Sequence, residues 1–301
     1  METPNQLPKS YKSIVFIVLA ALLGGAFSPL SKIALKEISP IPFTLLRFLL
    51  ATFTLLPFII KQRLFRFENF RKLAFVSLLA TANVMLFVFG VQRTTATIAQ
   101  TLYAGVPLVA GAFSYLILKE KFHPKKLFGI IIGFIGVLVI TILPIIGQPT
   151  TFNGNFIGNS IILVAVCSFA LYSVLSKQFQ ATYSPLELTM FFILTTTVIQ
   201  LLLVPFGVNH FPDWYHVSKE AIFGLLYVGI LGTGVYYLIY QYAIKNATPI
   251  IASMILYLQP IFTFFWSVVL LKERITVGLI AGAVLAFIGV AFVTNFGRSD
   301  V

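Results

Sequence analysis

The sequence contains ten apolar runs of the length a helix needs to cross a membrane, about 20 residues for a hydrocarbon core of roughly 30 Å. Each run is bounded by charged residues, Pro, Gly or Asn. The runs cover residues 13–35, 42–60, 73–91, 96–118, 127–146, 156–175, 186–208, 221–243, 247–271 and 277–296. Because a helix satisfies its own backbone hydrogen bonds in lipid, we predict an all-α integral membrane protein with ten transmembrane helices.

The composition excludes a soluble protein of ordinary type. Of the 301 residues, 58% are hydrophobic and only 10% are charged, whereas a water-soluble domain has about a quarter of its residues charged. The single cysteine, Cys167, lies in an apolar run, which excludes a disulfide and leaves no metal or redox ligand set. We expect no cofactor, no metal and no enzymatic activity, since no nucleophile or paired acid and base is present either.

The net charge of +12 comes from Lys and Arg in short loops, not from a basic stripe or tail. We therefore expect no nucleic-acid partner. With the N-terminus inside, most loop Lys and Arg residues fall on the inner side, as the positive-inside rule requires. We predict a multi-pass plasma-membrane protein with both termini in the cytoplasm.

The chain is internally duplicated. The segment 27–32, Phe-Ser-Pro-Leu-Ser-Lys, recurs as Tyr-Ser-Val-Leu-Ser-Lys at 172–177, and Lys119-Glu120-Lys121 recurs as Lys272-Glu273-Arg274. Shared hydrophobicity alone would not produce matching Pro, Gly and charged residues. Because each unit has an odd number of spans, the two halves, 1–147 and 148–301, must be inverted relative to each other, which is a recurrent transporter design.

Two longer signatures carry a family resemblance. Ala99 through Pro107 to Glu120, and Ala252 through Pro260 to Glu273, are each followed by a Gly-rich span ending in Ile-Gly-Val. Arg47 in Leu46-Arg47-Phe48 is a further match. Over essentially its whole length the chain resembles EamA-type members of the drug/metabolite transporter superfamily. It departs from them in span one, where Gly24-Gly25 replaces the common Trp-Gly, and this leaves the substrate open.

The resemblance implies a transporter of metabolites, commonly an exporter of amino acids, with a cavity lined mainly by spans one, three, four, six, eight and nine. Members of the superfamily also move nucleotide sugars, phosphorylated sugars and lipid-linked sugars. A lipid-linked sugar flippase is therefore the alternative function. A receptor or purely structural membrane protein would not require an inverted duplication.

Arg47 is the ionisable residue deepest inside a predicted span. An arginine within a membrane is costly enough to indicate function, and here it could attract a substrate carboxylate or pair with a carbonyl between helices. Alternatively, it lies close enough to the outer end of its span for the guanidinium to reach the interface by snorkelling.

None of the nine Asp and Glu residues lies in the middle of a predicted span. Glu187 begins span seven, while Glu120 and Glu273 lie in turns, where we expect ion pairs with neighbouring Lys or Arg. Proton-coupled carriers usually need an intramembrane carboxylate or histidine. We therefore predict facilitated transport without a carboxylate relay.

Polar and aromatic residues on the cavity spans are the candidates for substrate binding, because buried Tyr and Gln need hydrogen-bond partners. With Arg47 they are Ser28, Asn83, Gln100, Tyr103, Ser168, Tyr172, Tyr236, Tyr237, Tyr240, Ser253, Tyr257 and Gln259. Any one of them could equally tie helices together. Such a largely uncharged pocket favours a small neutral or zwitterionic substrate over a polyanion.

Pro29, Pro107 and Pro260 each remove a backbone donor within a span, so we interpret them as kinks or hinges. Gly129-x-x-x-Gly133 and Gly278-x-x-x-Gly282-x-x-x-Ala286 are small-residue faces for close helix packing. Spans five and ten are therefore predicted to be scaffold, or alternatively a homodimer contact.

Overall fold

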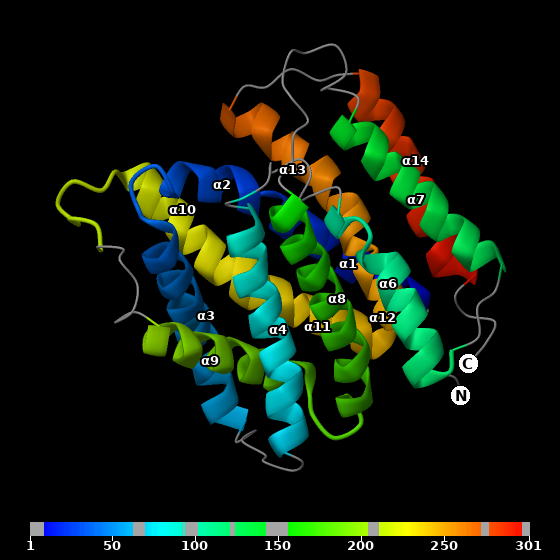
Figure 1. The fold of residues 1–301 in the computed structure, drawn as a ribbon, viewed down its shortest axis with the longest axis horizontal. Helices are drawn as coiled ribbons and strands as arrows, with labels where there is room; N and C mark the ends of the chain where they lie inside the picture. The colour runs from blue at the N-terminus through cyan, green and yellow to red at the C-terminus, as the bar shows by residue number, and fades with distance from the viewer. Residues whose placement is uncertain are drawn as a thin grey trace, which may run out of the picture.

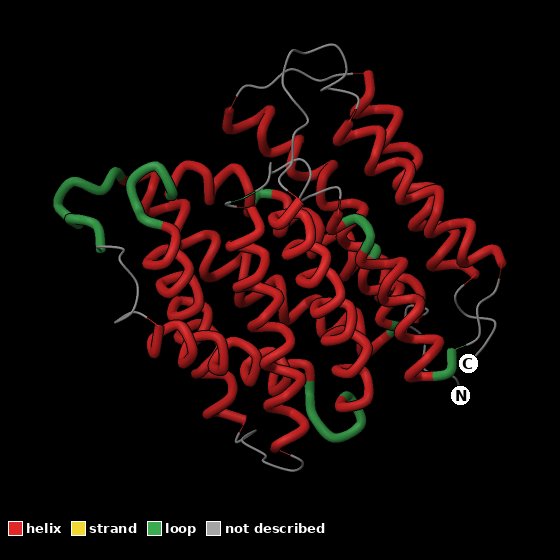
Figure 2. Tube along the Cα trace, in the orientation of Figure 1, coloured by secondary structure: helices red, strands yellow, loops and turns green. Residues whose placement is uncertain are grey.

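The computed structural model describes residues 9–62, 70–91, 93, 102–120, 124–142, 156–203, 211–271 and 277–296. Within these ranges the chain consists of helices and turns without a strand (Figures 1 and 2). Five helical stretches are long and apolar enough to cross a membrane, and several shorter ones are also apolar. The predicted all-α membrane class is confirmed at this level.

The helices follow the apolar runs of the sequence closely. In the first half they are α1 (Lys9–Gly25), α2 (Phe27–Ala34), α3 (Pro40–Gln62), α4 (Phe70–Val91), α6 (Val106–Phe113), the π-helical turn η1 (Ser114–Leu118) and α7 (Pro124–Ile142). In the second half they are α8 (Phe156–Phe179), α9 (Pro185–Leu203), α10 (Lys219–Gly229), the π-helical turn η4 (Ile230–Val235), α11 (Tyr236–Asn246), α12 (Pro249–Ser253), α13 (Ile255–Leu271) and α14 (Val277–Phe296).

Several of the apolar runs are interrupted helices. The first run breaks at Ala26 between α1 and α2, and the ninth breaks at Met254 between α12 and α13. Pro29 and Pro107 lie in the first turn of α2 and α6, where a missing N–H removes no helical hydrogen bond. Pro260 instead lies inside α13, beyond the break at Met254.

The two halves of the chain are interleaved. Helix α4 of the first half packs on α8 and α9 of the second, while α10 packs on α2 and α3 and α11 packs on α1. Helix α1 also packs on α13, and α7 packs on α14. Figure 1 shows α7 and α14 side by side along their lengths, at the edge of the bundle.

Glycine permits the close contact of α7 with α14. A Cβ atom on Gly289 would lie 2.4 Å from the backbone nitrogen of Gly133, and one on Gly136 would lie 2.6 Å from the nitrogen of Ala286. Real Cβ atoms do not approach backbone so closely. The glycine faces predicted for these spans therefore pack against each other within one chain, as in the scaffold interpretation, and a homodimer through spans five and ten stays a prediction.

The outward faces of the bundle carry large apolar side chains. More than half of each of the following side chains is exposed: Phe53, Phe58, Leu116, Ile157 and Ile280. So many exposed large apolar side chains are unusual on a water-soluble monomer. It suits a protein whose sides contact lipid.

We predict that Gly289→Val lowers the Tm of the detergent-solubilised protein by several degrees, because the added side chain has no space against α7. Overpacking typically costs about 1–3 kcal/mol. The control is Ala291→Val, at an exposed position on the same helix, which should leave the Tm nearly unchanged. Equal Tm values for the two variants would contradict the close packing.

Candidate functional site

Arg47 lies on the buried face of α3, together with Thr44, Phe48 and Ala51. Only 8% of its surface is exposed. Its Nε donates a hydrogen bond of 2.8 Å to Thr233 Oγ1 of η4, and its guanidinium also interacts with the Tyr237 hydroxyl. The guanidinium carbon lies 4.6 Å from the ring centroid of Phe27 and 4.9 Å from that of Phe48.

This geometry contradicts the snorkelling alternative for Arg47. The guanidinium turns into the bundle because hydroxyl acceptors and aromatic faces are available there, and cations are attracted to both. The side chain thereby connects α3 of the first half to η4 and α11 of the second.

The π-helical turn η4 positions the partner of Arg47. The Thr233 hydroxyl donates a 2.8 Å hydrogen bond to the Val228 carbonyl, which the widened turn makes available. Its remaining lone pairs are thus left to accept from Arg47. A Cβ atom on Gly229 would lie 2.7 Å from Leu50 Cβ, so glycine is what allows η4 and α3 to approach. Such π-bulges occur frequently at functional sites.

Tyrosines of α11 extend the polar region beyond Arg47. Tyr237 is in edge contact with Tyr236, with ring centroids 5.3 Å apart. Tyr240 shares a hydrogen bond of 2.7 Å with Ser173 of α8. Farther along, Gln241 donates to the Tyr172 hydroxyl at 2.7 Å and accepts from Gln180 at 2.7 Å.

A second arm of the polar region comes from the first half. Asn83 of α4 donates to the Tyr103 hydroxyl, and to the Ala165 carbonyl of α8 at 2.8 Å. Tyr103 also packs against the buried cluster of side chains that contains Tyr236 and Tyr237. Of these groups, the hydroxyls of Thr233 and Tyr237 contact the Arg47 guanidinium. We call the buried polar residues named so far from both halves the central polar cluster: Arg47, Asn83, Tyr103, Tyr172, Ser173, Thr233, Tyr236, Tyr237, Tyr240 and Gln241.

Four predicted site residues make other contacts. Ser168 binds the Leu79 carbonyl of α4 at 2.7 Å, and the Tyr257 hydroxyl binds the Ile130 carbonyl of α7 at 2.9 Å. Gln259 donates to the Gly24 carbonyl at 3.2 Å, while Ser253 bonds to Ile250 of its own helix at 2.6 Å. In these contacts the four residues tie helices together or bond within their own helix.

Two further candidates lie outside what the structure describes: Gln100, and the side chain of Ser28. The sequence analysis missed Thr233, Ser173 and Gln241. Gln241 could have been found, because it is an amide directly following Tyr240 in the same predicted span. Thr233 gave a weaker signal, since its importance depends on the π-helical turn.

The described carboxylates lie at helix ends, in turns or in a loop. Glu187 forms a capping box on α9, accepting from the Ser184 backbone N–H at 2.8 Å. Glu120 lies 3.8 Å from Lys126 Nζ, as predicted for this turn; burial raises the pKa of its carboxyl, and Lys126 and Lys177 oppose that rise. Hydrogen bonds from Ser218 lower the pKa of Glu37. In the described ranges no three His, Cys, Asp or Glu side chains group as metal ligands do.

Known proteins share both the sequence and the fold. Residues 11–142 and 156–295 match the EamA-like transporter family. A protein of Archaeoglobus fulgidus named as an uncharacterized transporter is 26% identical over 291 residues, 94% of this chain and 97% of that protein. YoaV of Bacillus subtilis, also named as an uncharacterized transporter, is 25% identical, covering 96% and 99% of the two chains.

A plant protein and a solved structure are also similar to this chain. The WAT1-related protein At3g53210 of Arabidopsis thaliana is 27% identical, over 73% of this chain and 66% of that protein. A solved protein structure with 16% sequence identity superposes with a TM-score of 0.79, covering 96% of this chain and 98% of the other, which shows the same fold. The names of the family and of the bacterial and archaeal relatives are those of transporters and not of enzymes. The chain therefore belongs to the EamA-like transporter family, within the drug/metabolite transporter superfamily, and is a membrane transporter.

Proposed function

We propose that the protein is a carrier that moves small neutral or zwitterionic metabolites, such as amino acids, across the cell membrane. It does so by alternating access between two inverted halves, residues 1–147 and 148–301, with both termini in the cytoplasm. The observation that carries the proposal is the central polar cluster. Both halves contribute to it, and it holds one positive charge among hydroxyls and amides.

The pairing of the helices supports the inverted halves. Helix α4 packs on α8 and α9, while the corresponding segments of the second half, α10, η4 and α11, pack on α1, α2 and α3. The outermost pair, α7 with α14, joins corresponding helices of the two halves. A two-fold relation between the halves would produce this pattern of contacts, and carriers with such repeats expose a central site to each side in turn.

The composition of the central polar cluster favours zwitterions over sugar nucleotides or lipid-linked sugars. A diphosphate would require several inward-facing Lys or Arg side chains, whereas Arg47 is the one cation of the cluster. Tyrosine hydroxyls can accept hydrogen bonds from a substrate ammonium, and their rings can attract it.

We predict saturable counterflow of a subset of amino acids in proteoliposomes that contain the purified protein. The panel should include large neutral and aromatic amino acids, because the cluster is rich in tyrosine. Liposomes without protein serve as the control. Exchange of no amino acid, together with exchange of a lipid-linked or nucleotide-linked sugar, would replace this proposal by its alternative.

We further predict that net uptake of a neutral amino acid is insensitive to an imposed pH gradient at constant external pH. Each carboxylate in the described ranges lies in a loop, in a turn or at a helix end, so none is placed to relay protons through the centre. The measurement compares initial rates with and without a collapsing protonophore. Strict dependence on the gradient would disprove transport without coupling to protons.

A further inference from the structure

We propose that the Arg47 guanidinium binds the carboxylate of the substrate and that Thr233 positions it for that contact. This inference rests on the proposed carrier function and specifies its substrate class as small zwitterions that bear a free carboxylate. It begins from the charge of Arg47, which none of its described neighbours neutralises.

The recorded neighbours of the guanidinium are all uncharged. They are the hydroxyls of Thr233 and Tyr237 and the rings of Phe27 and Phe48. No carboxylate is recorded against Arg47 in the part of the chain that the structure describes. The acidic residues outside that part are Glu2, Glu68, Glu273 and Asp300, and in the sequence all four lie outside the predicted spans. A buried charge without a counter-ion is costly, and a bound carboxylate would supply one.

The geometry of Thr233 indicates positioning and not only helix contact. Because its hydroxyl proton is directed at the Val228 carbonyl, its oxygen can only accept from Arg47. Its bond to Nε orients the guanidinium plane and leaves the terminal nitrogens for Tyr237 and for a ligand. A guanidinium matches a carboxylate through paired parallel hydrogen bonds, so this orientation matters for recognition.

The test compares each amino acid that exchanges in counterflow, beginning with L-phenylalanine, with its primary amide, which lacks the carboxylate. In the unmodified protein the amide should compete at least about tenfold more weakly, since a charge-assisted pair is lost. In Arg47→Gln the affinity for the amino acid should fall to near that of the amide, while the affinity for the amide should hardly change.

Further variants separate positioning from folding. Thr233→Val should weaken amino-acid competition without changing amide competition, and Arg47→Lys should restore part of the discrimination. The matched control is Arg93→Gln, which removes an exposed arginine that follows α4 and donates to the Phe89 carbonyl of that helix, and it should behave as the unmodified protein. Ligand-induced shifts in Tm give the same comparison for variants that no longer transport.

The outcomes distinguish the two proposals. Equal competition by amino acid and amide in the unmodified protein, with saturable exchange retained, would overturn carboxylate recognition by Arg47 and leave the carrier function standing. Absence of amino-acid exchange in the unmodified protein would overturn the carrier function for amino acids itself. Equal losses for amino acid and amide in Arg47→Gln would show that Arg47 only holds the fold.

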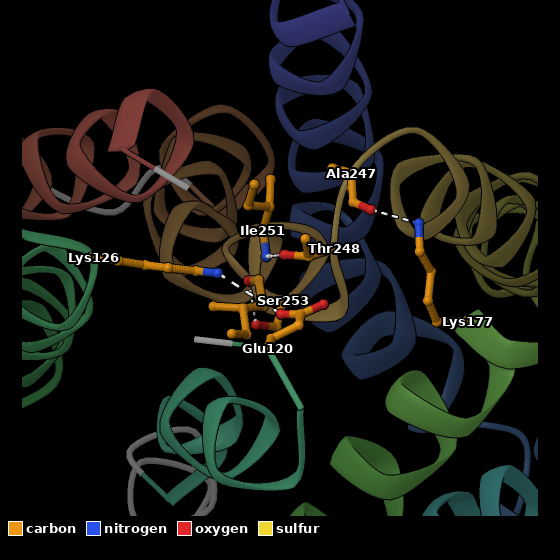
Figure 3. Close-up of polar contacts among 8 residues, drawn as sticks. Glu120, Lys126, Lys177, Ala247, Thr248, Ile251 and Ser253 are labelled. Carbon is orange, nitrogen blue, oxygen red and sulfur yellow. Dashed lines mark hydrogen bonds and ion pairs between the residues drawn. The ribbon is translucent and has the colours of Figure 1, made fainter. Parts of the chain in front are cut away.

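A second inference comes from a different set of contacts, at the end of the bundle that the charge distribution assigns to the cytoplasm. We propose that Glu120, Lys126 and Lys177 form a latch that keeps this end closed in the conformation described here. The proposal rests on alternating access, because only then must one end open. Figure 3 shows Lys126 and Lys177 approaching from opposite sides, with Glu120, Thr248 and Ser253 between them in this view.

The latch joins the two halves. Glu120 follows η1 of the first half, and Lys119 before it adopts a left-handed conformation with φ 55°, which a non-glycine residue rarely adopts. Lys177 of α8 lies in the same group of side chains as Glu120 (Figure 3) and donates to the carbonyls of Ile244 at 2.8 Å and Ala247 at 2.6 Å. Its ammonium thus stabilises the C-terminal end of α11.

Across the boundary between the halves, Glu120 and Lys177 interact by charge alone, and η1 packs on α8 at this point. Within the first half, Glu120 Oε2 is buried and no hydrogen bond to it is recorded, so its contact with Lys126 at 3.8 Å is an ion pair without a hydrogen bond. The short helix α12 packs beside α6 and α8 at this point. Opening this end would separate the turn containing Glu120 from α8 and α12, and ion pairs of this kind can be broken and remade during a transport cycle.

The test is hydrogen–deuterium exchange of the full-length protein in lipid nanodiscs. Glu120→Gln and Lys177→Gln should speed amide exchange several-fold in residues 114–120 and 244–253, and leave residues 129–136 of the α7 scaffold unchanged. The charge-matched controls are Glu220→Gln and Lys245→Gln, whose side chains are exposed. Unchanged exchange, or acceleration spread evenly over the whole protein, would overturn the latch.

Discussion

The structure depends on one constraint: in lipid, every backbone N–H and C=O must find its partner within the protein. Helices meet this demand along most of the described chain. The helices of the first, fourth and ninth apolar runs break at Ala26, Ala104 and Met254. Protein covers the backbone at these breaks, since the three residues are at most 1% exposed. The same applies to η4, where Thr233 bonds to a carbonyl in the widened turn. The breaks within the apolar runs at these three residues therefore lie in the interior.

The buried guanidinium of Arg47 follows from the same constraint. A charge in this interior persists only with favourable partners, and η4 supplies one because its π-helical turn brings Thr233 to α3. Gly229, at which a Cβ atom would clash with Leu50, keeps the two backbones close. The Tyr and Gln side chains of α11 then continue the hydrogen bonding toward α8. Hydrogen bonds of polar side chains therefore cross the boundary between the halves, while α7 and α14 form a closely packed scaffold joined through glycine.

Much of this architecture could be predicted from local features of the sequence. The lengths of the apolar runs predicted the helices, and the Gly-x-x-x-Gly spacings predicted the tight packing of spans five and ten, though not that they would pack on each other. The candidate list contained Arg47, Asn83, Tyr103, Tyr172, Tyr237 and Tyr240, all of which lie in the central polar cluster. The list also contained Ser168 and Tyr257, which bond to helix carbonyls, because a polar residue in an apolar span has the same local signature whether it binds a ligand or another helix.

The departure at Gly24 shows why local features were not sufficient. The sequence reveals only that Gly24 stands where the resembling transporters often have Trp. In the structure the ring of Tyr236 lies against Gly24, so that a Cβ atom on Gly24 would lie 2.7 Å from that ring. By itself the sequence determined the membrane class, the helical runs and the placement of charges, because these depend on residues close together along the chain. Only the tertiary structure decided that Arg47 faces inward and that Thr233 is its partner, because each depends on side chains brought together across 186 residues of sequence.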